Sequence, residues 1–303
     1  MAISASTVNR RRSPTLLSRL RSRRYAAYWM VLPLVLMVIG LVVYPFFYSI
    51  FLSFENKKET KFVGVRNYER LIRYGTFWLV VGNSFRFTLT AVFFKASLGL
   101  ALALILNNLP FRGQRVWRGV SLIPWVMPLA LSSLGWWWIF EPTHSAVNWI
   151  FVQFGITPKP WLSDPNWARV STIVTNIWFG TPFFMIMYLA GLKSIPQSLY
   201  EAAEIDGAGA TQRFRYVTLP MLRKLIAITM MFSTIVTFAN FDIVRILTRG
   251  GPRYTTHLFG TYAFNIGIET GHLPRGAAIA LFMFPVLGLA AFFILRNIAR
   301  GEE

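Results

Sequence analysis

Residues 25–54 read YAAYWMVLPLVLMVIGLVVYPFFYSIFLSF and contain no charged side chain. A helix needs about 20 mostly apolar residues to cross about 30 Å of hydrocarbon, so this stretch is long enough to span a membrane. The whole chain of 303 residues has a similar character, since 54% of it is hydrophobic and only 14% is charged. Soluble domains carry about 25% charged residues. We therefore expect an all-α, polytopic membrane protein and not a soluble enzyme.

Five further apolar segments follow, which brings the expected number of transmembrane helices to six. A basic segment before the first one is typical of a secretory signal. The apolar run is far longer than the roughly 7–15 residues of such a signal, so we expect a retained helix. The transmembrane domain is expected over residues 25–303. Its six spans are expected at residues 25–54, 78–107, 119–140, 170–192, 225–247 and 276–296.

The chain is strongly basic, with 31 Lys and Arg against 12 Asp and Glu and a formal net charge of +19. Residues 1–24 form an Arg-rich tail without any acid. Basic residues flank membrane helices on the cytoplasmic side, so we expect the N-terminus and, after six crossings, the C-terminus in the cytoplasm. The basic stretch 55–76 opposes this orientation, but the tail outweighs it. The charge thus predicts topology and contact with anionic lipid, and no nucleic-acid partner.

Residues that carry most enzyme chemistry are scarce or scattered. The sequence has no Cys, which excludes disulfides, cysteine nucleophiles and thiolate metal sites. Its three histidines, His144, His257 and His272, have no metal-ligand spacing, and it has no G-x-x-x-x-G-K-[ST] phosphate loop. An integral-membrane enzyme would need clustered His, Asp or Glu within the spans, where only Asp242 comes close. We expect no catalytic, cofactor-binding or metal-binding residue in this chain.

The loop between the fourth and fifth spans contains EAAEIDGAGATQRFRYVTLP, residues 201–220. Ser198 can serve as the N-cap of a short Ala-rich helix, with Glu201 completing a capping box. Gly207 can end that helix in the left-handed conformation, and a second helix follows with an apolar face. The pattern predicts a compact helix–turn–helix whose small residues permit close approach to another surface. A simple capped connector is the alternative.

The same run resembles the EAA loop of permease subunits of binding-protein-dependent ABC importers. That signature is EAA, three residues, Gly, nine residues and a hydrophobic–Pro close, and Asp206-Gly207-Ala208 is its sugar-importer form. Three further stretches are similar to sugar permeases of the maltose/glycerol-phosphate type, a carbohydrate-uptake family. They are FVGVRNYERLI (62–72), NIWFGTPFF (176–184) and ILTRGGPRYTT (246–256). The resemblance covers most of the chain after about residue 62.

This resemblance implies a MetI-like type I ABC importer permease fold in the inner membrane of a bacterial cell. It implies a sugar substrate and three kinds of protein partner: a second, homologous permease in a heterodimer, two copies of a cytoplasmic ABC ATPase, and an extracytoplasmic solute-binding protein. ATP and Mg would bind to the ATPase subunits, so this chain would hydrolyse nothing. The loop at residues 198–220 would couple the ATPase to alternating access. The implied ATPase-coupling residues are Glu201, Ala202, Ala203, Asp206, Gly207 and Ala208.

Polar residues inside the fourth and fifth spans are candidates for a substrate pathway, because polar groups within a membrane bundle usually serve a function. Their helical spacing places them on one face of each span. Amide and hydroxyl groups match the hydroxyls of a sugar, and aromatic rings stack on its C–H faces. The resemblance implies sugar contact, while helix packing remains the alternative. The expected pathway residues are Asn176, Phe179, Gly180, Phe183, Ser233, Val236, Thr237 and Asn240.

The identity of the solute stays open at this point. Phe183, Val236 and Thr237 depart from the maltose-permease pattern, which speaks against maltose itself. A polyol or a glycerol phosphoester is the alternative to a mono- or oligosaccharide. Because the eight pathway positions contain no Arg or Lys, a neutral solute is preferred.

Two other features of the spans call for an interpretation. Lys95 lies near the middle of its span, so we expect it to face protein or water, with an acid such as Asp242 as a candidate partner. Trp136-Trp137-Trp138 fits either an interfacial aromatic belt or a stacking role in the pathway.

Overall fold

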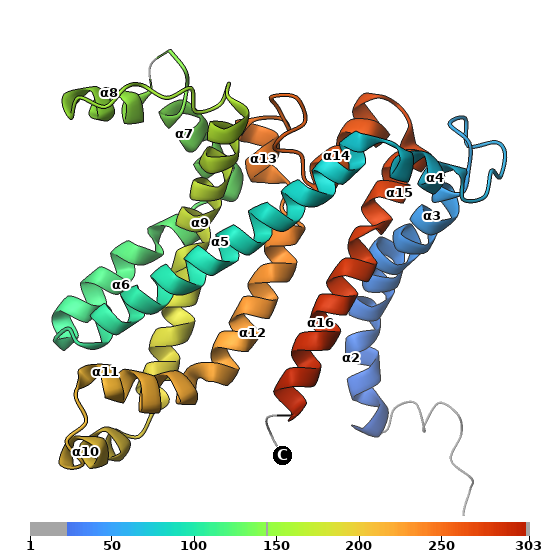
Figure 1. Cartoon of the computed structure of the whole chain (residues 1–303). Coiled ribbons are helices and arrows are strands. Elements are labelled where there is room, and N and C mark those ends of the chain that lie inside the picture. Colours follow the sequence, from blue (N-terminus) through green and yellow to red (C-terminus); the bar gives the residue numbers. More distant parts are fainter. Residues whose placement is uncertain (1–22, 144, 301–303) are drawn as a thin grey trace, which may run out of the picture. The chain divides into compact units, whose positions relative to one another are not determined.

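The computed structural model describes residues 23–143 and 145–300 (Figure 1). Within these ranges the chain is helical, with one isolated β-bridge between Glu55 and Phe62 and no strand. Most of the predicted Arg-rich tail lies outside the described residues. The chain divides into two compact units, Met1–Phe51 and Leu52–Glu303.

The first unit contains one long helical run. α2 (Arg23–Val38) continues through a π-helical turn, η1 (Ile39–Val43), into α3 (Tyr44–Ser53), whose last two residues belong to the second unit. Residues Tyr28–Ser53 are together long and apolar enough to cross a membrane. The first expected span is therefore a helix of the required length.

The second unit holds the remaining helices, of which α5, α9 and α12 are the longest. Its elements are, in order, α4 (Arg66–Arg73), α5 (Gly75–Asn107), α6 (Phe111–Val126), α7 (Leu129–Ile139), α8 (Ala146–Gln153), α9 (Pro165–Ser194), α10 (Gln197–Ile205), α11 (Ala210–Arg213), η2 (Phe214–Thr218), α12 (Leu219–Phe238), α13 (Asp242–Leu247), α14 (Phe259–Phe264), η3 (Asn265–Glu269), α15 (Leu273–Leu281) and α16 (Met283–Arg300).

The described helices account for four or five of the six expected spans by length and composition. Four of them pass both criteria, at Tyr28–Ser53, Gly75–Asn107, Pro165–Ser194 and Ala210–Leu247, and the pair α6 and α7 passes only when taken together. The last expected span is divided between α15 and α16, where the apolar stretch Leu273–Leu289 is shorter. The number of six spans therefore stays a prediction.

The third expected span, residues 119–140, is broken near its middle. α6 and α7 meet at an angle of 91°. Pro128 is the N-cap of α7, and Met127 before it has an extended backbone with ψ of 140°. A residue that precedes proline is disfavoured in the α conformation. Met127 follows this preference, and α6 ends before it. The bend places Trp125 and Leu129 on either side of the corner.

The core of the second unit lies where α5 packs against α9 (Figure 1). Phe184, Met185 and Tyr188 of α9 are fully buried in the core that α9 forms with α5. The two backbones approach closely at Gly99, where an added Cβ would overlap Phe184 Cβ and lie 3.0 Å from the backbone nitrogen of Met185. Small residues allow such close helix packing in membranes.

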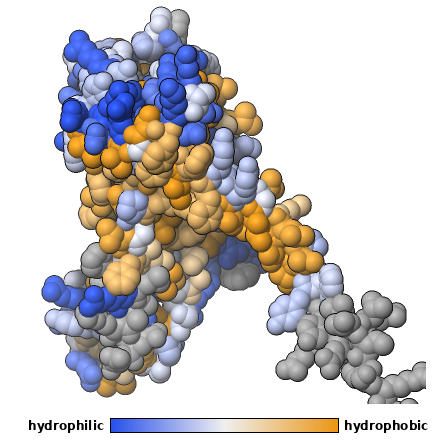
Figure 2. All heavy atoms as spheres, turned by 90° about the vertical axis from the view of Figure 1, so that its right-hand side faces the viewer, coloured by the Kyte–Doolittle hydropathy of each residue, from blue (hydrophilic) through white to orange (hydrophobic). Residues whose placement is uncertain are grey.

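The ends of α9 show how local sequence sets the frame of this core. The Asp164 carboxylate caps the helix by accepting from the backbone N–H groups of Asn166 and Trp167, at 2.9 and 3.1 Å. Pro165 takes the first helical position, where its missing N–H costs no hydrogen bond. Figure 2 shows hydrophobic side chains over the middle of the unit and hydrophilic ones gathered at its top, as expected for helices in lipid.

Candidate functional site

A cavity of about 120 Å³ lies between α5, α6, α7, α9 and α12. All eight residues that the sequence predicts for the substrate pathway line it. On α9 they stand at intervals of three, one and three residues. The same intervals recur from Ser233 on α12 to Asn240, which lies two residues beyond the end of that helix. This spacing puts each set on one helix face. Their role in binding a sugar stays a prediction, while their juxtaposition is a feature of the fold.

The cavity has an aromatic wall. Phe183 of α9 lies between Trp125 of α6 and Phe232 of α12, with ring centroids 6.0 and 5.4 Å apart. Of these three, only Phe183 was predicted from the sequence. Phe232 lies one helical turn before Val236, so the spacing that identified Val236 could also have identified it. Trp125 carries no such signal, because the bend between α6 and α7 brings it to the cavity.

The opposite, polar part of the lining is built around Lys95. Its ammonium donates to Asn176 Oδ1 of α9 at 2.9 Å and to Thr237 Oγ1 of α12 at 2.7 Å. The side chain is only 4% exposed, so the prediction that Lys95 faces protein or water is confirmed. Gly180 makes room for it, since an added Cβ there would overlap the Lys95 Cδ. One lysine thus connects three helices at the cavity.

Two predictions need correction, one about the partner of Lys95 and one about the charge of the solute. Asp242 is not among its partners: α12 ends at Phe238 and Asp242 begins α13, whereas Thr237 in the last turn of α12 takes the hydrogen bond. The preference for a neutral solute rested on eight positions without a basic residue. The lining as a whole includes Lys95, so that reasoning was incomplete.

A second polar group of the lining has an unused atom. Asn240 Oδ1 is buried and accepts no hydrogen bond from any described residue. A buried acceptor without a donor costs free energy. Asn240 is also one of the residues that line the cavity, so this unpaired acceptor belongs to the polar part of the lining.

The predicted coupling residues lie on α10 and the turn that follows it. Gly207 has φ of +78°, so the prediction that it ends the helix in a left-handed conformation is confirmed. The capping box of Ser198 and Glu201 is wrong, because α10 already begins at Gln197 after its N-cap Pro196. The second helix begins instead with Gly209 N–H donating to Gln212 Oε1 at 2.8 Å.

The surface of this helix–turn–helix is available for contact. Of the six predicted coupling residues, Ala203 and Ala208 are half-buried and the others are exposed, and neighbouring Ile205 is 87% exposed. Arg213 and Glu204 join the two short helices by an ion pair of 3.3 Å. An exposed apolar side chain on a short helix that also carries small residues fits a docking surface better than a free loop.

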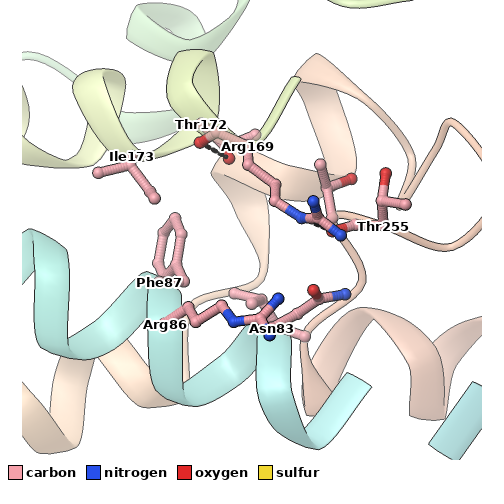
Figure 3. A pocket seen from close by; sticks show the side chains of 9 residues that line it. Asn83, Arg86, Phe87, Arg169, Thr172, Ile173 and Thr255 are labelled. Carbon is pink, nitrogen blue, oxygen red and sulfur yellow. Dashed lines mark hydrogen bonds between the residues drawn. The ribbon is translucent and has the colours of Figure 1, made fainter. Parts of the chain in front are cut away.

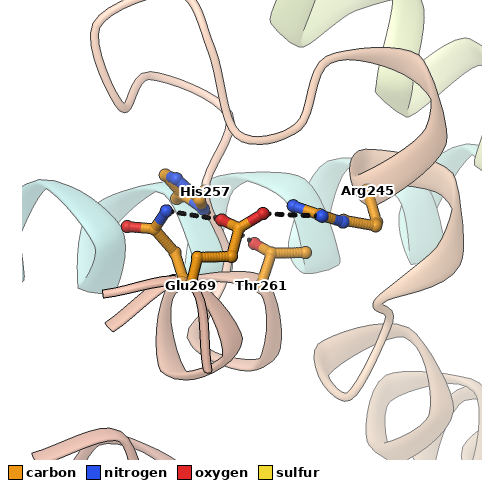
Figure 4. Close-up of polar contacts among 5 residues, drawn as sticks. Arg245, His257, Thr261 and Glu269 are labelled. Atoms are coloured by element: carbon orange, nitrogen blue, oxygen red, sulfur yellow. Dashed lines mark hydrogen bonds and ion pairs between the residues drawn. The ribbon is translucent and has the colours of Figure 1, made fainter. Parts of the chain in front are cut away.

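The segment between α13 and α14 is fastened by polar contacts (Figures 3 and 4). Arg169 of α9 donates through Nε to the Thr255 carbonyl at 3.1 Å, and Asn83 of α5 donates to the Tyr254 carbonyl at the same distance. Arg86 and Arg169 border a cavity of about 20 Å³ there (Figure 3). That volume holds about one water, so these groups position the segment and leave no room for a sugar.

Glu269 and His257 complete this arrangement (Figure 4). Glu269 forms a 2.7 Å ion pair with Arg245 and accepts from Asn265 at 2.7 Å, and these hydrogen bonds hold the pKa of Glu269 below its usual value. His257 contacts Thr261 through Nδ1 at 3.1 Å. Burial lowers the pKa of His257 to about 4, so this ring is neutral near pH 7.

The Trp136–Trp138 run lies away from the cavity. Trp136 packs between Phe140 and Trp178, with ring centroids 5.2 and 5.6 Å away, whereas Trp138 is 71% exposed. None of the three borders the 120 Å³ cavity within the described part of the chain. Their placement favours the aromatic-belt interpretation.

Residues 95–302 match the family described as binding-protein-dependent transport system inner membrane component. The chain is 35% identical to the trehalose/maltose transport system permease protein MalF of Thermococcus litoralis, over 90% of this chain and 93% of that protein. It is also 35% identical to the sulfoquinovosyl glycerol transport system permease protein SmoG of Agrobacterium fabrum, over 92% of each chain. The resemblance to permeases is confirmed.

A solved structure supports the fold. The chain aligns with one chain of a bacterial ABC transporter involved in the import of the acidic polysaccharide alginate, with a TM-score of 0.81 and 22% identity, over 94% of this chain and 98% of that one. The predicted fold class, an all-α, MetI-like importer permease, is confirmed.

Proposed function

This chain belongs to the family of inner membrane components of binding-protein-dependent transport systems, and on that premise we propose that it lines the translocation pathway of an ATP-driven importer of a carbohydrate. The observation that carries the proposal is the 120 Å³ cavity in which all eight predicted residues meet. It combines an aromatic wall with amide and hydroxyl groups, which is the lining that a sugar requires. The names of two relatives mention trehalose, maltose and sulfoquinovosyl glycerol, and these solutes agree with the proposed class.

The size of the cavity favours a pathway shared with a second subunit. Ligand pockets usually measure about 300–1,000 Å³, and this cavity measures about 120 Å³. A second, homologous permease facing it would supply the missing wall in a heterodimer. A solute-binding protein would deliver the sugar from outside. A polyol or a glycerol phosphoester is the alternative solute.

The exposed helix–turn–helix supplies a coupling role. Two copies of an ATPase subunit would bind ATP and Mg. We propose that this loop docks on them through Glu201, Ala202, Ala203, Asp206, Gly207 and Ala208. The exposure of α10 and the left-handed turn at Gly207 support this role. Rigid-body motion of the docked loop would then open the pathway on alternate sides. In this arrangement the chain itself hydrolyses nothing and sits in the inner membrane with both termini in the cytoplasm.

Filling the cavity tests the proposal. Val236 borders the cavity on α12 and is 55% exposed, so Val236→Trp adds bulk where the sugar would pass. Ile228 lies on the same helix outside the lining and is 43% exposed, so Ile228→Trp is the matched control. We expect binding-protein-dependent uptake in proteoliposomes to fall at least about tenfold in Val236→Trp and to persist in the control. Normal uptake by Val236→Trp would show that the solute does not pass through this cavity.

A further inference from the structure

Lys95 brings a basic side chain into the lining of the cavity, and none of the described residues gives it an anionic partner. Its ammonium bonds to two neutral oxygens, those of Asn176 and Thr237. Within residues 23–143 and 145–300 it forms no ion pair, and Glu269 at the outer end is already paired with Arg245. Neutral acceptors orient an ammonium but do not cancel its charge. A charge inside a membrane bundle is unfavourable unless a partner compensates it.

The surroundings hold this charge at the cavity. Gly180 leaves room for the stem of the lysine to cross α9, and the bonds to α9 and α12 keep the ammonium between the two helices that carry the pathway residues. An ammonium has three N–H donors, and the two bonds use two of them. A side chain that is 4% exposed and held from two sides is organised in advance for an acceptor that arrives in the cavity.

The other groups of the lining indicate what kind of acceptor fits. The amide of Asn240 also belongs to the lining, and an amide suits a sugar hydroxyl. The rings of Trp125, Phe183 and Phe232 suit the C–H face of a pyranose. A positive charge, a hydroxyl acceptor and an aromatic face together match a sugar that carries both hydroxyls and an anionic group.

We propose that Lys95 makes this pathway selective for an acidic sugar, one that bears a carboxylate or another anionic group beside its hydroxyls. The inference rests on the proposed transport function and narrows its solute class. In the empty cavity Asn176 and Thr237 hold the ammonium in place, and in the occupied cavity its remaining N–H donates to the anionic group. A charge-assisted hydrogen bond is about twice as strong as one between neutral groups.

Direct binding to the assembled permease–ATPase complex in nanodiscs tests the proposal. The probes are two pairs that differ only in oxidation at C6, glucuronate with glucose and galacturonate with galactose. Dissociation constants are measured by saturation-transfer NMR. We expect at least one uronate to bind about tenfold or more tightly than its neutral counterpart. Failure of both uronates to bind, or equal binding within both pairs, would overturn the proposal; an acid of the partner permease that pairs with Lys95 would give this result.

Three variants separate charge from packing. Lys95→Gln keeps hydrogen-bonding capacity without the charge, so the uronate preference should vanish. Lys95→Arg keeps the charge and should keep the preference. Asn176→Asp supplies a built-in carboxylate beside the ammonium and should also abolish the preference, which covers the case in which Lys95→Gln fails to assemble. A preference that survives in Lys95→Gln or in Asn176→Asp refutes the role of the charge.

The two proposals fail in distinguishable ways. If Val236→Trp blocks uptake but the uronate preference is absent or independent of Lys95, the cavity is the pathway and only the acidic-sugar inference is wrong. If Val236→Trp transports normally, the pathway itself is misplaced.

Discussion

A methyl group added at Gly99 would collide with the backbone of the neighbouring helix. The new Cβ would overlap Phe184 Cβ and lie 3.0 Å from the Met185 nitrogen and 3.1 Å from the Phe184 carbonyl carbon. Ordinary contacts of a Cβ begin near 3.4 Å, so α5 and α9 must separate by several tenths of an ångström or more. Backbone atoms cannot rotate out of the way as a side-chain end can.

The expected cost follows from two opposing terms. Overpacking a close-packed core costs about 1–3 kcal/mol, and replacing Gly by Ala inside a helix returns up to about 1 kcal/mol. Because the contacts at Gly99 include backbone atoms, we take the upper part of the overpacking range, about 2–3 kcal/mol. Subtracting about 1 kcal/mol for the helix propensity of Ala leaves a net loss of about 1–2 kcal/mol for Gly99→Ala. At roughly 2–4 °C for each kcal/mol in a chain of this size, the melting temperature should fall by roughly 2–8 °C.

The control is another glycine on the same helix. Gly82 has open space around its Cβ position among the described residues, so Gly82→Ala should leave the melting temperature unchanged or raise it slightly. Both variants are compared by the apparent melting temperature of the detergent-purified protein at one fixed heating rate, because unfolding of such proteins is often irreversible. Equal melting temperatures for Gly99→Ala and the native chain would refute the close approach of α5 and α9 as the basis of this core.

Two further predictions concern the turn at Gly207 and the segment that contains His257. Gly207→Pro forces φ from +78° to about −65°, so it should abolish binding-protein-stimulated ATPase activity while membrane insertion persists. Gly209→Ala is the control, because Gly209 has an ordinary φ of −68°. Normal stimulation of the ATPase in Gly207→Pro would contradict the coupling role of this turn. Because burial lowers the pKa of His257 to about 4 from an ordinary value near 6.5, the unfolded chain binds a proton that the folded chain excludes between these pH values. Stability should therefore fall as the pH drops from about 6.5 to 4, by up to about 3 kcal/mol, and level off below. Melting temperatures from pH 7 to 4.5 should decline less in His257→Asn, and parallel curves would argue against this role of His257.

Local features of the fold were predictable because their causes are local. Long apolar runs predict helices wherever the chain has to satisfy its backbone in lipid, and the first, second, fourth and fifth segments are single helices or continuous runs. The left-handed Gly207 was likewise predictable from its place after an Ala-rich helix. The expected N-cap was misplaced by two residues, because Pro196 is the N-cap and Ser198 already lies inside α10.

The break in the third segment was only partly predictable. Pro124 and Pro128 are both visible in the sequence as helix breakers, yet Pro124 lies inside α6 and only Pro128 separates two helices. Proline within a membrane helix is tolerated when neighbours satisfy the freed carbonyl. Which of two prolines bends the chain depends on these neighbours, and they come from other segments.

The sequence by itself determined which residues share a helix face, since that depends only on the helical repeat. It therefore placed Asn176 with Phe183, and Ser233 with Thr237, before any packing was known. Only the tertiary structure decided that Lys95, 81 residues before Asn176 and 142 before Thr237, completes their lining. The rotation and separation of α5 against α9 determine this meeting, and they depend on where Gly99 and Gly180 let the backbone or the lysine stem pass. No periodicity within one helix contains that information.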